Sequence, residues 1–152
     1  MIDAAVAAFV QEGIGIQIGT RNASLTPSGA RATAVLVDAS GTHLVVFVPK
    51  VSAPHVLPNL EDNGQAAVVF ARPVDERSLQ IKGTFVSARN ATLKERPVIE
   101  AQWEGFMKQV ELIGIPRAIF ADWFIWPSLA IRIKATTIFD QTPGPNAGKA
   151  LP

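Results

Sequence analysis

Four polar residues in the first half of the chain are of the types that bind an anionic group. Arg31 opens a run that is otherwise apolar, and Lys50 and Ser52 follow the next apolar run. His55 stands where a helix could begin and present free backbone N–H groups. Cations, a hydroxyl and backbone donors that converge make a phosphate site. Each residue taken singly is more simply a solvated side chain, but Arg31, Lys50 and Ser52 flank one predicted hairpin, which favours a shared site.

Further polar residues lie on predicted strands later in the chain. Gln80 and Lys82 fall on the polar face of the alternating run Ser78–Arg89, and Arg132 and Lys134 fall on the polar face of the last apolar run. Alternation places such residues on one face of a strand. Two interpretations stay open for them, namely contact with a ligand and ordinary solvation.

The sequence lacks the motifs of several large enzyme classes. It contains no GxGxxG, GxxxxGK[ST], GxSxG or HExxH. His43 and His55 are the only histidines, and nothing in the sequence brings either beside a serine and an aspartate. A lone histidine in a strand is more often structural than catalytic. We therefore do not expect a hydrolase.

Composition restricts the partners. The 152 residues carry a net charge of +1, which favours binding neither to nucleic acid nor to an acidic membrane. No cysteine is present, so disulfides and thiolate metal sites are excluded. The chain has no uncharged apolar run of about 18 residues and no basic flank of a signal peptide at its start. We expect a cytoplasmic protein that acts on a small molecule.

An aromatic segment, Phe120–Trp126, is the other unusual feature. Aromatic side chains offer flat apolar area to a planar ligand or to a partner chain. Packing in the core or at a dimer contact is the alternative, and it is the simpler explanation for Trp103 and Phe106.

Apolar periodicity predicts one mainly β domain over residues 1–152, with residues 140–152 as an extended C-terminal tail. Two helices are expected, at Ile2–Glu12 and Thr92–Ile113, and a short excursion at Ser52–Gly64. Six strands are expected at Ile14–Arg21, Arg31–Val37, His43–Val48, Ala66–Arg72, Ser78–Arg89 and Leu129–Phe139. Short turns between several of them predict an antiparallel meander. Such a meander must close or pack on a second sheet, because an open apolar edge aggregates. We expect a small barrel with flanking helices and, at Gly83, a bulge or a close approach by a ligand.

The order of these segments resembles the pyridoxamine 5′-phosphate oxidase-like family of FMN-binding split barrels. The resemblance is carried by the Arg31–Val37 run, a Gly turn, His43–Val48, a Ser-containing excursion that ends in NLEDNGQAAVVF, the run SLQIKGT, and Trp126-Pro127 before the last strand. It covers nearly the whole chain. It implies a six-stranded antiparallel split barrel that forms a homodimer with FMN at the interface.

The resemblance also implies roles for individual residues. Arg31 matches the opening arginine that grips the phosphate, and Ser52 matches the phosphate-binding serine, with Lys50 and His55 nearby. Ser78 or Gln80 matches the polar position that faces the flavin ring, and Lys82 would also lie near the ring. The chain departs from the family pattern after Ser52, where Ala53-Pro54 replaces an Arg-Lys pair, and at Leu36, where the family has a lysine.

Two functions follow. The first is a flavin-dependent oxidoreductase that uses FMN on an unidentified small molecule. The second is a non-catalytic dimeric module that binds flavin or haem, or a relative that has lost its cofactor; haem would require His43 or His55 as an axial ligand. The homodimer is also expected because the apolar strands, Trp123 and Trp126 exceed what a small monomeric barrel covers easily.

Overall fold

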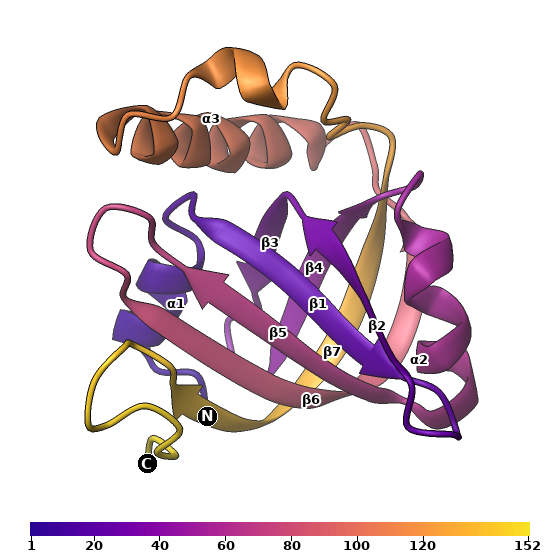
Figure 1. The fold of residues 1–152 in the computed structure, drawn as a ribbon. Coiled ribbons are helices and arrows are strands. Elements are labelled where there is room, and N and C mark those ends of the chain that lie inside the picture. The colour runs from indigo at the N-terminus through magenta and orange to yellow at the C-terminus, as the bar shows by residue number, and fades with distance from the viewer.

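One antiparallel sheet with helices around it makes up the computed structural model, which describes residues 1–152 (Figure 1). The strand order is β2-β1-β5-β6-β7-β4-β3. The strands are β1 (Gly15–Arg21), β2 (Pro27–Ala32), β3 (Ala34–Val37), β4 (His43–Pro49), β5 (Gln65–Ala71), β6 (Ser78–Asn90) and β7 (Ser128–Asp140). The helices are α1 (Ala4–Val10), α2 (Leu57–Asn63) and α3 (Arg96–Leu112), with the 3₁₀ helices η1 (Ala53–His55) and η2 (Arg117–Phe120). None of these helices is long and apolar enough to cross a bilayer.

The two edges of the sheet are adjoining parts of one stretch of chain. β2 forms one edge and β3 the other, and only Thr33 separates them. The backbone N–H of Thr33 donates to the carbonyl of Phe47 at 2.9 Å. The sheet therefore curls until its edges approach, as expected for a barrel. Seven strands replace the predicted six, because the chain passes from one edge to the other at Thr33 and this divides the expected strand Arg31–Val37 in two.

The inside of the curled sheet holds the main core of 23 buried residues. Strands bury every second side chain, so Ile16 and Ile18 on β1 point inward together with Val68 and Phe70 on β5. The intervening residues remain on the outer face. The alternation read from the sequence thus gave the correct inner face for β1 and the first half of β6.

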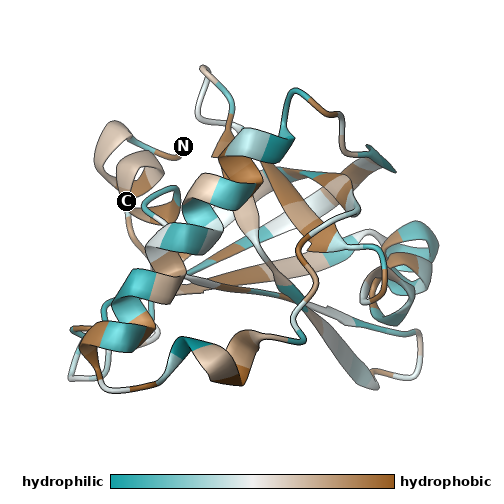
Figure 2. Cartoon of the chain, turned by 90° about the horizontal axis from the view of Figure 1, so that it is seen from above, coloured by the Kyte–Doolittle hydropathy of each residue, from teal (hydrophilic) through white to brown (hydrophobic).

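Helix α3 and the segment after it cover one end of the curled sheet (Figure 1). Figure 2 shows α3 in alternating hydrophilic and hydrophobic patches, as expected for a helix with one buried face. Its buried face packs a smaller cluster, in which the rings of Trp103, Phe106, Phe120 and Trp123 lie 4.5 to 6.3 Å apart between centroids. These aromatic side chains therefore join α3 to η2.

The predicted interruption at Gly83 is a bulge. The register between β6 and β7 shifts between Lys82 and Gly83. A Cβ atom on Gly83 would lie 2.4 Å from the carbonyl oxygen of Lys134 and 2.5 Å from Cγ2 of Ile133. Only glycine fits there, because β7 approaches this point too closely for any side chain.

Some boundaries differ from the prediction. Helix α3 begins at Arg96 rather than Thr92, although the Glu95 carboxylate does accept from the Thr92 backbone N–H at 2.8 Å. This hydrogen bond is one of the two in a capping box, and it closes a turn that precedes the helix.

The C-terminal tail returns to β7, where the N–H of Leu151 donates to the carbonyl of Ile138 at 2.8 Å.

Candidate functional site

Arg31 on β2 lies against residues 113–127, which connect α3 to β7 and are here called the lid segment. The central carbon of its guanidinium is 3.7 Å from the centroid of the Trp123 indole, which is a cation–π contact. The period of β2 turns Ala32 into the core and Arg31 away from it. One contact thus connects the outer face of the sheet to the aromatic cluster.

A hollow of about 200 Å³, here called the aromatic pocket, opens beside this contact. Its lining includes Arg31, the hydroxyl-bearing Thr33 and Ser52, and the aromatic side chains of Trp123 and Phe124. Asp122 also lines it but makes no ion pair, since the ion pairs of the structure involve other residues. A cation, two hydroxyls and flat rings are therefore gathered in one place.

Burial lowers the pKa of the Arg31 guanidinium, because desolvation disfavours its charge. The side chain is half-buried, lies against the indole of Trp123 and forms no ion pair, although Asp122 lines the same pocket. An arriving anion would supply the missing charge-assisted hydrogen bonds. Arg31 is thus placed to bind an anion.

A second hollow begins at Arg31 and runs across the outer face of the sheet. Strand pairing sets Arg31 opposite Gln17, Gln17 opposite Val69, and Val69 opposite Gln80. The hollow measures about 390 Å³. Its first wall is therefore a row with one guanidinium and two carboxamides.

The next row of the sheet is almost free of side chains. Gly29 pairs with Gly19, Gly19 with Ala67, and Ala67 with Lys82. A Cβ on Gly19 would meet nothing nearer than the Ala67 carbonyl oxygen at 3.7 Å, so the space above it is open. Gly29, Gly19 and Ala67 therefore make a flat floor on which a planar group can lie.

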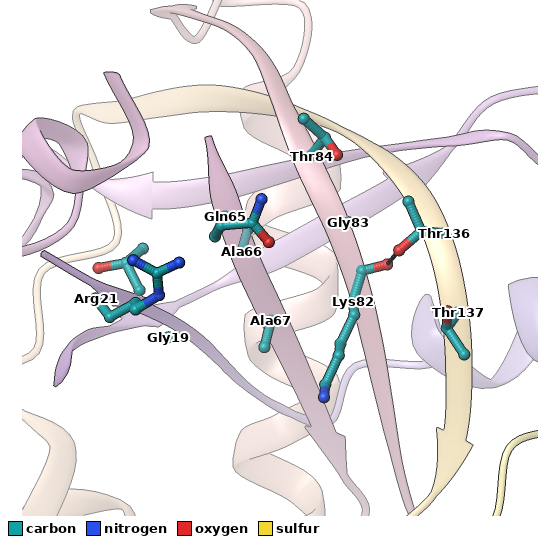
Figure 3. Close-up of a pocket in the computed structure, with 11 residues that line it drawn as sticks. Gly19, Arg21, Gln65, Ala66, Ala67, Lys82, Gly83, Thr84, Thr136 and Thr137 are labelled. Atoms are coloured by element: carbon teal, nitrogen blue, oxygen red, sulfur yellow. Dashed lines mark hydrogen bonds between the residues drawn. The ribbon is translucent and has the colours of Figure 1, made fainter. Parts of the chain in front are cut away.

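A third hollow of about 540 Å³ shares Gly19 and Ala67 with the second (Figure 3). Its far wall carries Arg21, Gln65 and Thr84, and Lys82 stands at its side. We call the second and third hollows together the trough. The trough runs along the outer face of β1, β5 and β6, and at Arg31 it meets the aromatic pocket.

Four of the seven predicted site residues line these hollows. Arg31 and Ser52 line the aromatic pocket, and Gln80 and Lys82 line the trough. Strand register brings Arg31, Gln80 and Lys82 to one face of the sheet, and Ser52 lies in the turn between β4 and η1.

Lys50, His55 and Ser78 line none of the three hollows. Lys50 is exposed, and the hydroxyl of Ser78 donates to the carbonyl of Glu76 at 2.9 Å at the far end of β6. His55 ends η1 instead of beginning a helix, and its own N–H donates to the Ser52 carbonyl at 3.1 Å. The expected free N–H group at His55 is therefore absent.

Sequence reasoning missed the floor and the second carboxamide. Gly19, Gly29, Ala67 and Gln17 have no unusual chemistry, and only the tertiary structure places them between the charged residues. One signal was available, because Gln17 and Gly19 alternate with buried isoleucines in β1 and so had to face outward.

The donor set fits a flavin mononucleotide. A phosphate requires a cation and a hydroxyl donor, which Arg31 and Ser52 supply, whereas the buried Thr33 hydroxyl already donates to the Phe47 carbonyl at 3.3 Å. A planar ring with polar edges requires a flat floor beside amide groups. The set does not fit haem. His43 is hydrogen bonded through Nδ1 to Asp38 at 3.1 Å, and neither it nor His55 lines a hollow, so no axial ligand is present there.

Comparison with known proteins supports the same fold. No protein-family model and no curated protein matches the sequence. Among solved structures, HupZ of Group A Streptococcus matches with a TM-score of 0.57 at 15% identity, covering 97% of this chain and 100% of its own. An FMN-binding protein from Syntrophomonas wolfei matches with a TM-score of 0.56 at 8% identity, covering 88% of this chain and 81% of its own.

A putative pyridoxamine 5′-phosphate oxidase from Lactobacillus delbrueckii gives a TM-score of 0.52 at 10% identity, covering 88% of this chain and 89% of its own. The chain has the fold of these proteins. This split-barrel fold is the one that the sequence resemblance predicted. Because the identities are low, the likeness concerns the fold, and the ligand must be argued from the residues of the trough.

Proposed function

We propose that this protein binds FMN in the aromatic pocket and the trough and is a flavin-dependent oxidoreductase of a small molecule. The observation that carries the proposal is Arg31, a half-buried cation with no carboxylate partner, at the junction of the two hollows. Two of the structures that share the fold are an FMN-binding protein and a putative pyridoxamine 5′-phosphate oxidase, which supports a flavin as the ligand.

The phosphate would be held by Arg31 and by the hydroxyl of Ser52. The ring would lie on the floor of the trough, where the carboxamides of Gln17 and Gln80 can hydrogen bond to its polar edge. Flavin supplies hydride acceptance and donation when it is bound. The residues of the protein orient the ring, and Lys82 at the end of the floor row places a positive charge beside it.

A homodimer is part of the proposal. The trough is open on the outer face of the sheet, and a second copy packed over that face would exclude water from the ring. Exposed apolar side chains are available for association, among them Ile119 and Phe124 of the lid segment at 63% and 67% exposure. Sedimentation velocity at micromolar concentration should show a dimer, and a stable monomer would contradict this part of the proposal.

Titration of flavin-free protein with FMN and with riboflavin tests the ligand. The two differ only in the phosphate, so an Arg31 phosphate contact predicts that FMN binds at least about tenfold more tightly. In Arg31→Met this preference should disappear while riboflavin affinity remains. Arg132→Met, which removes an exposed cation on β7, is the matched control and should keep the preference. Absence of FMN binding at high micromolar concentration would remove the proposal.

A flavin-binding module without catalytic activity is the second candidate. The specific observation in its favour is that, of the cations expected at the phosphate, only Arg31 lines the aromatic pocket, while Lys50 does not. Weak phosphate binding would follow. If the protein binds FMN but the bound flavin, once reduced by dithionite, passes no electrons to any acceptor other than oxygen, this candidate is preferred.

A further inference from the structure

The third hollow of the trough holds two cations that the proposed phosphate site does not use. Arg21 and Lys82 line it, and neither forms an ion pair with a carboxylate. No acidic residue lines this hollow of about 540 Å³, and hydroxyls of Thr84, Thr136 and Thr137 complete its rim. A hollow with two unpaired cations and no acid favours an anion.

Strand register explains why these two cations act on the same space. Lys82 pairs with Ala67, which pairs with Gly19, and Arg21 lies two residues beyond Gly19 on the same face of β1. The two cations are therefore two strands apart, about 10 Å across the sheet. Figure 3 shows their side chains on opposite sides of Ala67. Because Gly19 and Ala67 leave the middle open, a group seated on the floor is within reach of both.

The remaining polar groups of the hollow are available to varying degrees. The hydroxyl of Thr136 donates to the Lys82 carbonyl at 3.0 Å, and the Arg21 guanidinium donates to the Asn22 carbonyl at 3.3 Å. The ammonium of Lys82 lies 4.9 Å from the Phe139 ring centroid, a contact that holds it at the trough without neutralising it. Both cations thus keep donors free.

We propose that the Arg21–Lys82 wall binds the terminal anionic group, phosphate or carboxylate, of a small hydroxyl-bearing molecule that is the substrate. The role as substrate rests on the proposed function, because it places the molecule beside the flavin ring. The binding of the anion is independent of the proposed function, because it depends only on residues of the third hollow.

Experiments on flavin-free protein test the binding of the anion separately from the binding of the flavin. Amide chemical shifts, followed at constant ionic strength, report titration with glycerol 3-phosphate, glycerate and neutral glycerol. We expect saturable shifts at Arg21, Gln65 and Lys82 with one or both anions, and none with glycerol. The anion that binds more tightly shows whether the terminal group is a phosphate or a carboxylate. Equal shifts with glycerol, or no saturation with either anion at tens of millimolar, would overturn the proposal.

Charge-removing variants locate the site. Lys82→Met and Arg21→Met should each weaken binding of the preferred anion about tenfold or more. Lys134→Met, an exposed lysine of β7 outside the hollow, should leave it unchanged; if it weakens binding equally, the effect is general charge and the site is wrong. If the protein binds the anion but not FMN, only the flavin proposal is wrong. If it binds FMN but not the anion, only the Arg21–Lys82 site is wrong.

Discussion

The carboxamide of Gln102 on α3 is hydrogen bonded through both of its polar atoms to the backbone of Val35 on β3. The Val35 N–H donates to Oε1 at 3.0 Å, and Nε2 donates to the Val35 carbonyl at 2.8 Å. Gln11 accepts from the N–H of Val37 at 3.0 Å on the same edge. β3 is an edge strand, so these two glutamines replace the strand that is missing beside it.

Replacement of Gln102 by Met should lower the free energy of unfolding by about 3 kcal/mol. The change leaves two buried backbone groups without partners, each at about 1–3 kcal/mol. Urea unfolding followed by circular dichroism measures the loss. Gln109→Met on the same helix is the control, because the Oε1 of Gln109 has no partner and its Nε2 donates only to the exposed Glu12 carboxylate, at 3.4 Å, and to no backbone group. Equal destabilisation of both variants would argue that helix packing, rather than the edge contact, sets the cost.

Gly83→Ala should destabilise the protein by several kcal/mol or prevent folding. The added Cβ would lie 2.4 Å from a backbone oxygen of β7, which cannot move without breaking the β6–β7 pairing. Gly19→Ala, where the nearest atom is at 3.7 Å, should fold with nearly unchanged stability. Thermal unfolding of the two variants compares them, and a Gly83→Ala protein as stable as Gly19→Ala would show that the bulge can relax.

Glu95 should make stability depend on pH in the acid range. Its hydrogen bonds with Arg89 first, and then with Thr92, lower the pKa of its carboxyl to about 2 from an ordinary value near 4.5. Because the folded pKa is the lower one, the contribution is complete above about pH 4.5 and is lost as the pH falls toward about 2. The side chain of Arg89 is half-exposed, so solvent screening reduces the contribution to about 1 kcal/mol.

The measurement is the stability difference between wild type and Glu95→Gln across that range. The difference should be full at pH 7 and vanish near pH 2. Glu100→Gln removes a carboxylate from an exposed pair with Arg96 and should change stability by less than about 0.5 kcal/mol at any pH. A constant difference for Glu95→Gln from pH 7 to pH 2 would show that the ionised carboxylate contributes nothing.

Trp123→Leu should weaken FMN binding without unfolding the protein. The indole holds the Arg31 guanidinium at 3.7 Å, and its loss frees that side chain to sample other rotamers. We expect about a five- to tenfold loss of FMN affinity, since a cation–π contact contributes about 0.5–2 kcal/mol. Trp126→Leu is the control, because Trp126 packs near Arg96 and not Arg31. Equal losses in both variants would contradict the positioning role.

Periodicity was sufficient to predict most of the fold. Alternating residues in β1 and the start of β6 can bury only one face, so the inner face of these strands and the outward direction of Gln80 and Lys82 followed from the pattern. Asp3 is the N-cap of α1, where its carboxylate accepts from the Val6 N–H at 2.8 Å. These features depend on neighbours within a few residues, which the sequence states directly.

The site was decided by the tertiary structure. Alternation fixes which face a side chain takes, but the register between strands fixes its neighbours, and register depends on turns and on the curl of the whole sheet. Only the register places Gly29, Gly19 and Ala67 in one row and so makes a floor between Arg31 and Arg21. For the same reason Lys50 and Ser78, which have suitable chemistry, lie elsewhere.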